Sequence, residues 1–228
     1  MLITVLLLVI VAGGVTAAVL LLSRKAPQTA PETTTATPEK PPSPPVTTRP
    51  LPAARNTGWQ VIVNQDSGLV YEVPGSWTLG GTTMSRPGGV LSLSGLAAAR
   101  PFLCEGKELV RGEVGSGRMT RQDDPALVAG AVAEGAAKTG YGSPTVALGP
   151  AVPTTVGDLK GSVVVADVTA ATPGSCGPGK AQITVLALTA PNGVVAVKIE
   201  VPELGGDAHL SPTAEDVRKI LESVRPLS

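Results

Sequence analysis

The sequence predicts an α+β domain over residues 57–228, in which helices pack on an antiparallel β-sheet. Several short runs alternate apolar and polar residues, which is the period of half-buried strands. Two segments carry apolar residues at helical spacing behind a capping residue. An Asn-Gly pair between two β-rich runs is typical of a tight antiparallel hairpin. Before this domain we expect a transmembrane anchor, residues 1–23, and a linker, residues 24–56.

The first part of the domain is predicted to consist of strands. Leu69, Tyr71 and Val73 alternate with their more polar neighbours, and the turn residues Asp66-Ser67-Gly68 join this run to the preceding one. Pro74-Gly75-Ser76 ends the hairpin. The predicted strands of this part cover residues 59–63, 69–73, 77–79, 90–94 and 109–114.

A change to helical spacing follows. Asp123 or Asp124 is expected to cap a helix with Pro125 in its first turn, and Gly140 to Gly142 end it. Strands then return, and the last two are joined across Asn192-Gly193. These later strands cover residues 145–148, 161–168, 181–189 and 194–201.

The C-terminal segment predicts an amphipathic helix. Ser211-Pro212 is expected to begin this helix, and Pro226 to end it. Glu215 and Asp216 lie in its first turn, where the helix dipole favours acidic side chains. Four apolar residues recur at positions i, i+3, i+4 and i+7 and should cover a sheet face. They are Val217, Ile220, Leu221 and Val224.

Residues 1–23 are interpreted as an uncleaved signal-anchor. Leu2 to Leu22 contains only apolar residues, Gly and Thr. A helix of this length spans about 31 Å, close to the ~30 Å hydrocarbon core of a bilayer. A signal peptide would have a basic start and a shorter apolar run. Cleavage after Thr16 to Ala18 is the alternative, and it would leave an apolar tail.

The orientation of the anchor rests on conflicting signals. Arg24 and Lys25 follow the helix, and positive charges favour the cytoplasmic side. The linker and the cysteine pair instead favour export. We expect the C-terminal domain to lie outside the cytoplasm, with basic residues upstream of Met1 in the natural N-terminus.

The linker is predicted to be disordered, because Ala26 to Arg55 holds nine Pro and seven Thr and buries little apolar surface. A plain spacer is the leading interpretation. A mannosylated stalk and a ligand for a proline-binding module stay open as alternatives.

Composition argues against nucleic-acid binding. From Thr57 onward the chain has 13 Lys and Arg against 16 Asp and Glu, a net charge of −3, and the whole chain has only two Trp, two Tyr and one Phe. The abundance of Gly and Pro fits the GC-rich codon usage of actinobacteria.

Cys104 and Cys176 are the only cysteines. Their separation matches neither C-x-x-C nor a zinc pattern, and the single His209 cannot complete a Cys/His set. We expect a disulfide, worth about 4 kcal/mol in the chain-entropy model. Two buried, unpaired thiols are the alternative.

The run from Gly68 to Pro74, with Trp59 before it and Trp77 after it, resembles the opening of PsbP-like domains. The closing Lys219 to Arg225 looks like their last helix. The element order is similar to the α/β/α sandwiches of mycobacterial lipoproteins of the LpqN kind, and to a domain of unknown function that follows an anchor and stalk in actinobacterial membrane proteins. The resemblance implies protein binding or assembly and no shared active-site residues. The chain departs from those lipoproteins because it has an anchor in place of a lipidated Cys.

No recognised catalytic, phosphate-binding or metal motif is present, and we predict no catalytic, cofactor or metal residues. Four features were weighed. Asp123-Asp124 is an acid/base or ion-binding site, or else a helix cap. Gly115-Ser116-Gly117-Arg118 is an anion cradle or a surface loop. Trp59, Tyr71 and Trp77 line a ligand pocket or pack under the sheet, and His209 is a base or a solvated loop residue. In each case we favour the second interpretation.

These observations predict a membrane-anchored, non-catalytic extracytoplasmic domain that binds a protein or a cell-envelope ligand such as a glycan, without a cofactor. The alternative is an envelope hydrolase that uses acidic residues, which a set of Asp and Glu clustered in one cleft would favour. A purely structural spacer is the third hypothesis.

Overall fold

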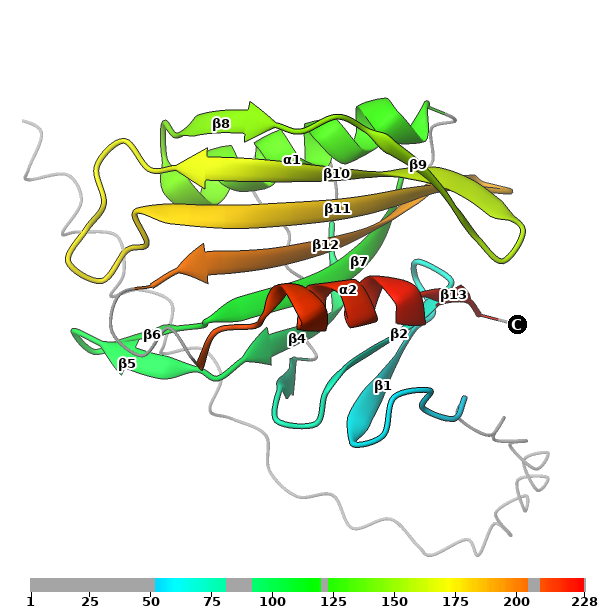
Figure 1. Cartoon of the computed structure of the whole chain (residues 1–228), viewed down its shortest axis with the longest axis horizontal. Helices are drawn as coiled ribbons and strands as arrows, with labels where there is room; N and C mark the ends of the chain where they lie inside the picture. Colours follow the sequence, from blue (N-terminus) through cyan, green and yellow to red (C-terminus); the bar gives the residue numbers. More distant parts are fainter. Residues whose placement is uncertain (1–51, 81–91, 120–122, 205–209, 228) are drawn as a thin grey trace, which may run out of the picture. The chain divides into compact units, whose positions relative to one another are not determined.

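The computed structural model describes residues 52–80, 92–119, 123–204 and 210–227. The predicted anchor and the predicted linker up to residue 51 lie outside this part of the chain. Within the described residues, no helix combines the length and hydropathy that a bilayer crossing requires. The described residues form the antiparallel α+β fold in Figure 1, so the predicted fold class is confirmed.

The main sheet has eight antiparallel strands in the order β3-β4-β7-β12-β11-β10-β8, with β9 also paired to β10. The long β11–β12 hairpin confirms the predicted one. Its two-residue loop is Pro191 and Asn192, and the positive φ, 120°, falls on Gly193. The strands are β3 (Thr78–Gly80), β4 (Ser94–Ala99), β7 (Gly112–Met119), β8 (Thr145–Leu148), β9 (Val152–Val156), β10 (Leu159–Thr169), β11 (Lys180–Ala190) and β12 (Gly193–Glu203).

Two smaller sheets and two helices complete the described fold. A three-stranded sheet joins β1 (Trp59–Asn64), β2 (Leu69–Pro74) and β13 (Arg225–Pro226). A separate hairpin pairs β5 (Phe102–Cys104) with β6 (Lys107–Leu109). The helices are α1 (Pro125–Tyr141) and α2 (Ala214–Ser223).

The main sheet is buried on both faces because its central strands are apolar on both sides. On β12, Val195, Val197 and Ile199 belong to one hydrophobic cluster, while Val194 and Ala196 belong to another. The first cluster lies under α2 and the β1–β2 hairpin, and the second lies under α1. Figure 1 shows the two helices on opposite faces of the sheet. This arrangement produces the predicted sandwich.

Both helices begin at a side-chain cap. The Asp124 carboxylate accepts from the Ala126 backbone N–H at 2.9 Å, which confirms the capping interpretation of the acidic pair. The second helix begins later than predicted: its cap is Thr213, in a capping box with Asp216, and Pro212 precedes the cap. The predicted apolar stripe of α2 packs into the core as expected.

The weaker strand predictions need correction. The strand predicted at residues 90–94 falls partly outside the described residues, and β4 begins only at Ser94. The strand predicted at 109–114 is divided, because β6 ends at Leu109 and β7 begins at Gly112. Strand β9 has no counterpart among the predictions, since Val152-Pro-Thr-Thr-Val156 contains a proline and pairs only with β10.

The two ends of the domain meet at Glu72. Its buried carboxylate accepts from the backbone N–H groups of Arg55 (2.8 Å) and Asn56 (2.9 Å) and from Arg225 Nη1 (2.9 Å). Burial alone would raise the pKa of Glu72, but these hydrogen bonds outweigh it and lower the pKa. The last residues of the predicted linker are therefore bound to the domain beside its C-terminal strand.

Candidate functional site: a pocket above a buried lysine

A pocket of about 160 Å³ opens where the α1 C-terminus meets the ends of β6, β7 and β12 and the β10–β11 loop. Its walls are apolar: Leu109, Val110, Pro178, Pro202 and Leu204. Its polar lining residues are Glu113, Tyr141 and Glu200. A concave apolar pocket with a few convergent polar groups is the usual form of a ligand site.

The two pocket carboxylates are bridged from beneath by Lys198. Its ammonium donates to Glu200 Oε2 at 2.6 Å and also to Glu113 Oε1. Tyr141 donates its hydroxyl to Glu200 Oε1 at 2.8 Å. The Lys198 side chain is only 2% exposed, against 18% for Glu113 and 10% for Glu200. The carboxylates therefore reach the pocket, while the lysine lies behind them.

Strand register brings these residues together. Glu113 of β7 lies directly opposite Glu200 of β12, and Lys198 shares their face because it precedes Glu200 by two residues. Opposite Lys198 is Gly115, where an added Cβ would lie 2.5 Å from Leu96 Cδ2. A side chain at this position would displace Leu96.

Electrostatics keep the lysine charged. Burial by itself would lower the pKa of Lys198, but the charges of Glu200 and Glu113 raise it by more, so the pKa lies above its usual value. A protonated ammonium has three donors and no lone pair. Lys198 therefore holds the two carboxylates and is not a base or a nucleophile at neutral pH.

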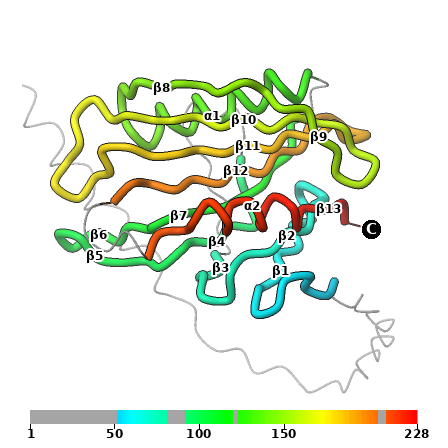
Figure 2. The backbone as a smooth tube through the Cα atoms, viewed as in Figure 1, coloured from blue at the N-terminus to red at the C-terminus, as the bar shows by residue number. Residues whose placement is uncertain are grey.

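The disulfide braces two walls of this pocket. Cys104 and Cys176 are bonded, with their Cα atoms 5.8 Å apart, which confirms the predicted pairing. Cys104 ends β5, whose partner β6 supplies Leu109, and Cys176 lies two residues before Pro178. Ser175 adds a 2.7 Å hydrogen bond to Glu105 in the β5–β6 turn. Figure 2 shows this hairpin and the β10–β11 loop at the same end of the sheet.

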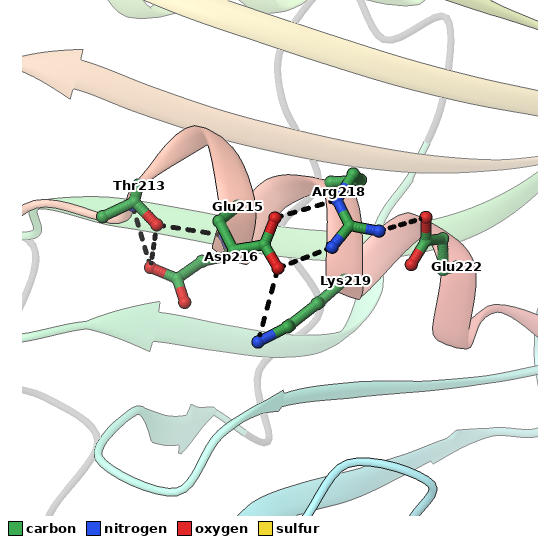
Figure 3. A network of polar contacts seen from close by, with 6 residues as sticks. All are labelled: Thr213, Glu215, Asp216, Arg218, Lys219 and Glu222. Carbon is green, nitrogen blue, oxygen red and sulfur yellow. Dashed lines mark hydrogen bonds and ion pairs between the residues drawn. The ribbon is translucent and has the colours of Figure 1, made fainter.

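A second hollow, of about 420 Å³, lies between α2 and strands β9 and β10, on the other face of the sheet. Its charged rim is engaged in ion pairs along α2 (Figure 3): Arg218 binds both Glu215 and Glu222. Hydrogen bonds from Arg218 hold the pKa of Glu215 below its usual value. We rank this hollow second because Arg218 and Glu222, two of its charged lining residues, are bound to each other.

The sequence-predicted candidates lie elsewhere. Gly115-Ser116-Gly117-Arg118 belongs to strand β7, so it is neither a surface loop nor an anion cradle. Ser116 is buried and bonded to Asn64 Nδ2 at 2.7 Å, and Arg118 donates to the Ser67 carbonyl at 2.7 Å.

The three aromatic candidates pack in or against the hydrophobic core, which agrees with the packing interpretation favoured above. They are Trp59, Tyr71 and Trp77. Burial raises the pKa of Tyr71 to about 12, although a hydrogen bond with Ser116 opposes the shift. His209 lies outside the described residues. Within the described part of the chain, no group of three or more His, Cys, Asp and Glu is placed to hold a metal ion.

Sequence reasoning missed the pocket residues. The signal was present in the strand predicted at 194–201, where Lys198 and Glu200 interrupt an apolar run two residues apart. Charges spaced by two in a strand buried on both faces indicate a paired, buried cluster. That Glu113 is their partner follows only from the strand register, which the sequence pattern does not give.

Comparison with known proteins places the chain in a family. The sequence model of the family described as "Domain of unknown function (DUF8017)" matches residues 52–228. The chain belongs to the DUF8017 family. No curated protein sequence matches it.

Two solved structures are similar to this DUF8017 chain. The solution structure of cyanobacterial PsbP (CyanoP) from Synechocystis sp. PCC 6803 has a TM-score of 0.50 at 10% identity, covering 78% of this chain and 98% of that one. A crystal structure from Bacteroides thetaiotaomicron VPI-5482 has a TM-score of 0.38 at 9% identity, covering 75% and 49% of the two chains. The first likeness shows that the DUF8017 domain has a PsbP-like fold.

Proposed function

We propose that this DUF8017 protein is a membrane-anchored, non-catalytic binding module of the cell envelope. Residues 1–23 hold it in the membrane, and the domain outside the cytoplasm binds a partner protein or an envelope ligand. The observation that carries the proposal is the disulfide-braced pocket above Lys198. An oxidised brace is suited to an extracytoplasmic domain.

The position of the pocket supports this role. The domain is entered at Arg55 and Asn56, which are bound to Glu72 near the C-terminal strand β13. In Figure 1 this corner and the β5–β6 hairpin lie at opposite ends of the long axis. A domain tethered at the first corner presents its pocket at the distal end.

A second candidate, an envelope hydrolase acting through acidic residues, is favoured by one observation: Glu113 and Glu200 face each other in one pocket. Acid/base chemistry needs one carboxyl protonated and the other ionised. Lys198 donates to both carboxylates, an arrangement that suits binding better than proton transfer.

The test is crosslinking in intact envelopes with the full chain. Leu109→Trp fills the pocket, and Leu103→Trp places the same ring on the same hairpin at a side chain that is 73% exposed. We expect a reproducible protein or glycan partner with the parent and with Leu103→Trp, and loss of that partner with Leu109→Trp. Failure of the parent to capture any partner contradicts the proposal.

The membrane topology is tested separately with intact spheroplasts. Protease added outside should cleave at the linker and release the domain. A chain that stays intact under this treatment, while lysed spheroplasts give the fragment, contradicts the extracytoplasmic location.

A further inference from the structure

The hollow between α2 and strands β9 and β10 leaves part of the hydrophobic core uncovered. Helix α2 has ten residues and is about 15 Å long, whereas β10 and β11 each have eleven residues and extend about 36 Å (Figure 1). The volume of about 420 Å³ lies within the range of about 300–1,000 Å³ that is usual for small-molecule sites.

The apolar lining of this hollow is entirely aliphatic. All five of its apolar side chains belong to one hydrophobic cluster or pack against it. They are Val156, Val163, Leu186, Leu221 and Val224. An aliphatic group that enters the hollow therefore extends an existing core and removes apolar surface from water.

The charges that α2 contributes to the rim cancel one another. Arg218 pairs with Glu215 and Glu222, and Lys219 pairs with Glu215 (Figure 3). This network holds two positive and two negative charges, so α2 by itself selects neither an anion nor a cation.

Arg55 supplies the charge that the α2 network does not balance. Its backbone N–H donates to the Glu72 carboxylate at 2.8 Å, which fixes the residue at the rim. Within the described part of the chain, its guanidinium forms no ion pair or hydrogen bond. The rim of an aliphatic hollow therefore carries one uncompensated positive charge.

We propose that this hollow binds an anionic amphiphile, a carboxylate or phosphate group carried on an aliphatic chain. The guanidinium of Arg55 presents a planar set of donors that matches either head group, and the aliphatic lining takes the chain. The inference goes beyond the proposed function, because the hollow shares no lining residue with the pocket above Lys198.

The experiment is an amide NMR titration of the full chain in phosphatidylcholine nanodiscs, without detergent. The probes are hexanoate, hexyl phosphate, 1-hexanol and n-hexylamine, which share one chain and differ in the head. Because Arg55 is exposed, we expect the two anions to bind only about two- to fivefold more tightly than hexanol and to shift resonances of the lining residues. Equal binding of hexanol or hexylamine overturns the proposal, and so does the absence of any anion-induced shift. The tighter of the two anions distinguishes a free carboxylic acid from a lipid phosphate.

Chain length tests whether the aliphatic part is buried. Each buried methylene should increase the affinity about fourfold, so hexanoate should bind about 15-fold more tightly than butanoate. Equal affinities show an ion pair at the surface without burial of the chain, and they overturn the proposal.

Arg55→Glu tests the charge. The backbone bond to Glu72 survives this substitution, so the fold should be retained. We expect the preference to reverse, with hexylamine binding more tightly than hexanoate. Arg100→Glu is the matched control, because Arg100 is exposed and does not line the hollow; its preference should stay that of the parent. An unchanged preference in Arg55→Glu, or the same reversal in both variants, overturns the proposal.

Val156→Trp tests the place. It fills the hollow, whereas Val152→Trp puts the same ring on the same strand at a residue that is 57% exposed and outside the lining. We expect hexanoate binding to be lost in the first variant and kept in the second, and equal effects contradict the proposal. If Val156→Trp does not fold, Arg55→Glu decides the question. Leu109→Trp should leave hexanoate binding unchanged, so failure of this inference is distinguishable from failure of the proposed function.

Discussion

Lys198→Met tests whether one ammonium allows two carboxylates to share the pocket floor. The Lys198 side chain is 2% exposed and forms ion pairs with both Glu113 and Glu200. Methionine retains an unbranched apolar stem and removes the charge. Removing one partner of a buried ion pair costs roughly 3–5 kcal/mol, because the remaining charges stay buried without compensation. We expect a decrease of about this size in the free energy of unfolding at pH 7.

The same variant should change the pH dependence of stability. The pKa of Lys198 is raised in the fold, so its contribution is complete below about pH 10.4 and is lost only as the pH rises through the folded value. The deficit of Lys198→Met should therefore be the same at pH 5 and pH 7, and should shrink only above about pH 10.4.

Urea unfolding of the full chain in micelles, followed by circular dichroism at pH 7 and pH 5, measures both effects. The control is the triple variant Lys198→Met, Glu113→Gln and Glu200→Gln, which leaves no charge in the cluster. Replacing a whole buried ion triad is often neutral, so the triple variant should recover most of the loss. A single variant as stable as the parent, or a triple variant no more stable than the single one, refutes the reasoning.

Five further variants test the fold. Glu72→Gln should lower stability at neutral pH, and the difference should shrink below about pH 4.3, because a lowered carboxyl pKa stabilises only above that range; acid titration of the urea midpoint checks this. Replacing Cys104 and Cys176 with Ser should cost about 2–5 kcal/mol in urea unfolding. Thr213→Ala should cost about 1 kcal/mol in the same assay and Thr213→Ser much less. Arg218→Ala should leave the urea midpoint unchanged, since its ion pairs are on the surface.

The local sequence pattern was sufficient to predict most strands of the sheet and both helices. It was insufficient where tertiary packing determines whether a segment forms a strand. Ser94 to Ala99 is rich in small residues of low β-propensity, yet it forms β4 because Ala97 and Ala99 pack into the core. The Gly-Ser-Gly stretch at 115–117 has the composition of a loop. It is a strand because β4 and β12 flank it and leave little room above Gly115.

The pocket illustrates the same limit for function. Lys198 and Glu200 are visible in the sequence as two charges in an apolar strand, but Glu113 lies 85 residues from Lys198 and is brought to it by β7–β12 register. The apolar walls come from three segments that share no sequence pattern. The cysteine pair was predictable from spacing, whereas its position beside the pocket depends on the fold.

The two ends of the domain are each held by a specific set of contacts. At one end, Glu72 holds the chain entry to the C-terminal strand through Arg55 and Arg225, so a pull on the linker acts on a buried, multiply bonded carboxylate. At the other end, the β5–β6 hairpin pairs with no further strand among the described residues, and an isolated hairpin is only marginally stable. The Cys104–Cys176 bond compensates for this weakness where the pocket walls need a fixed spacing. Reduction of the parent should therefore raise amide hydrogen exchange in the hairpin before it affects β11 and β12, and uniform exchange across the sheet would show that the disulfide stabilises the whole fold instead.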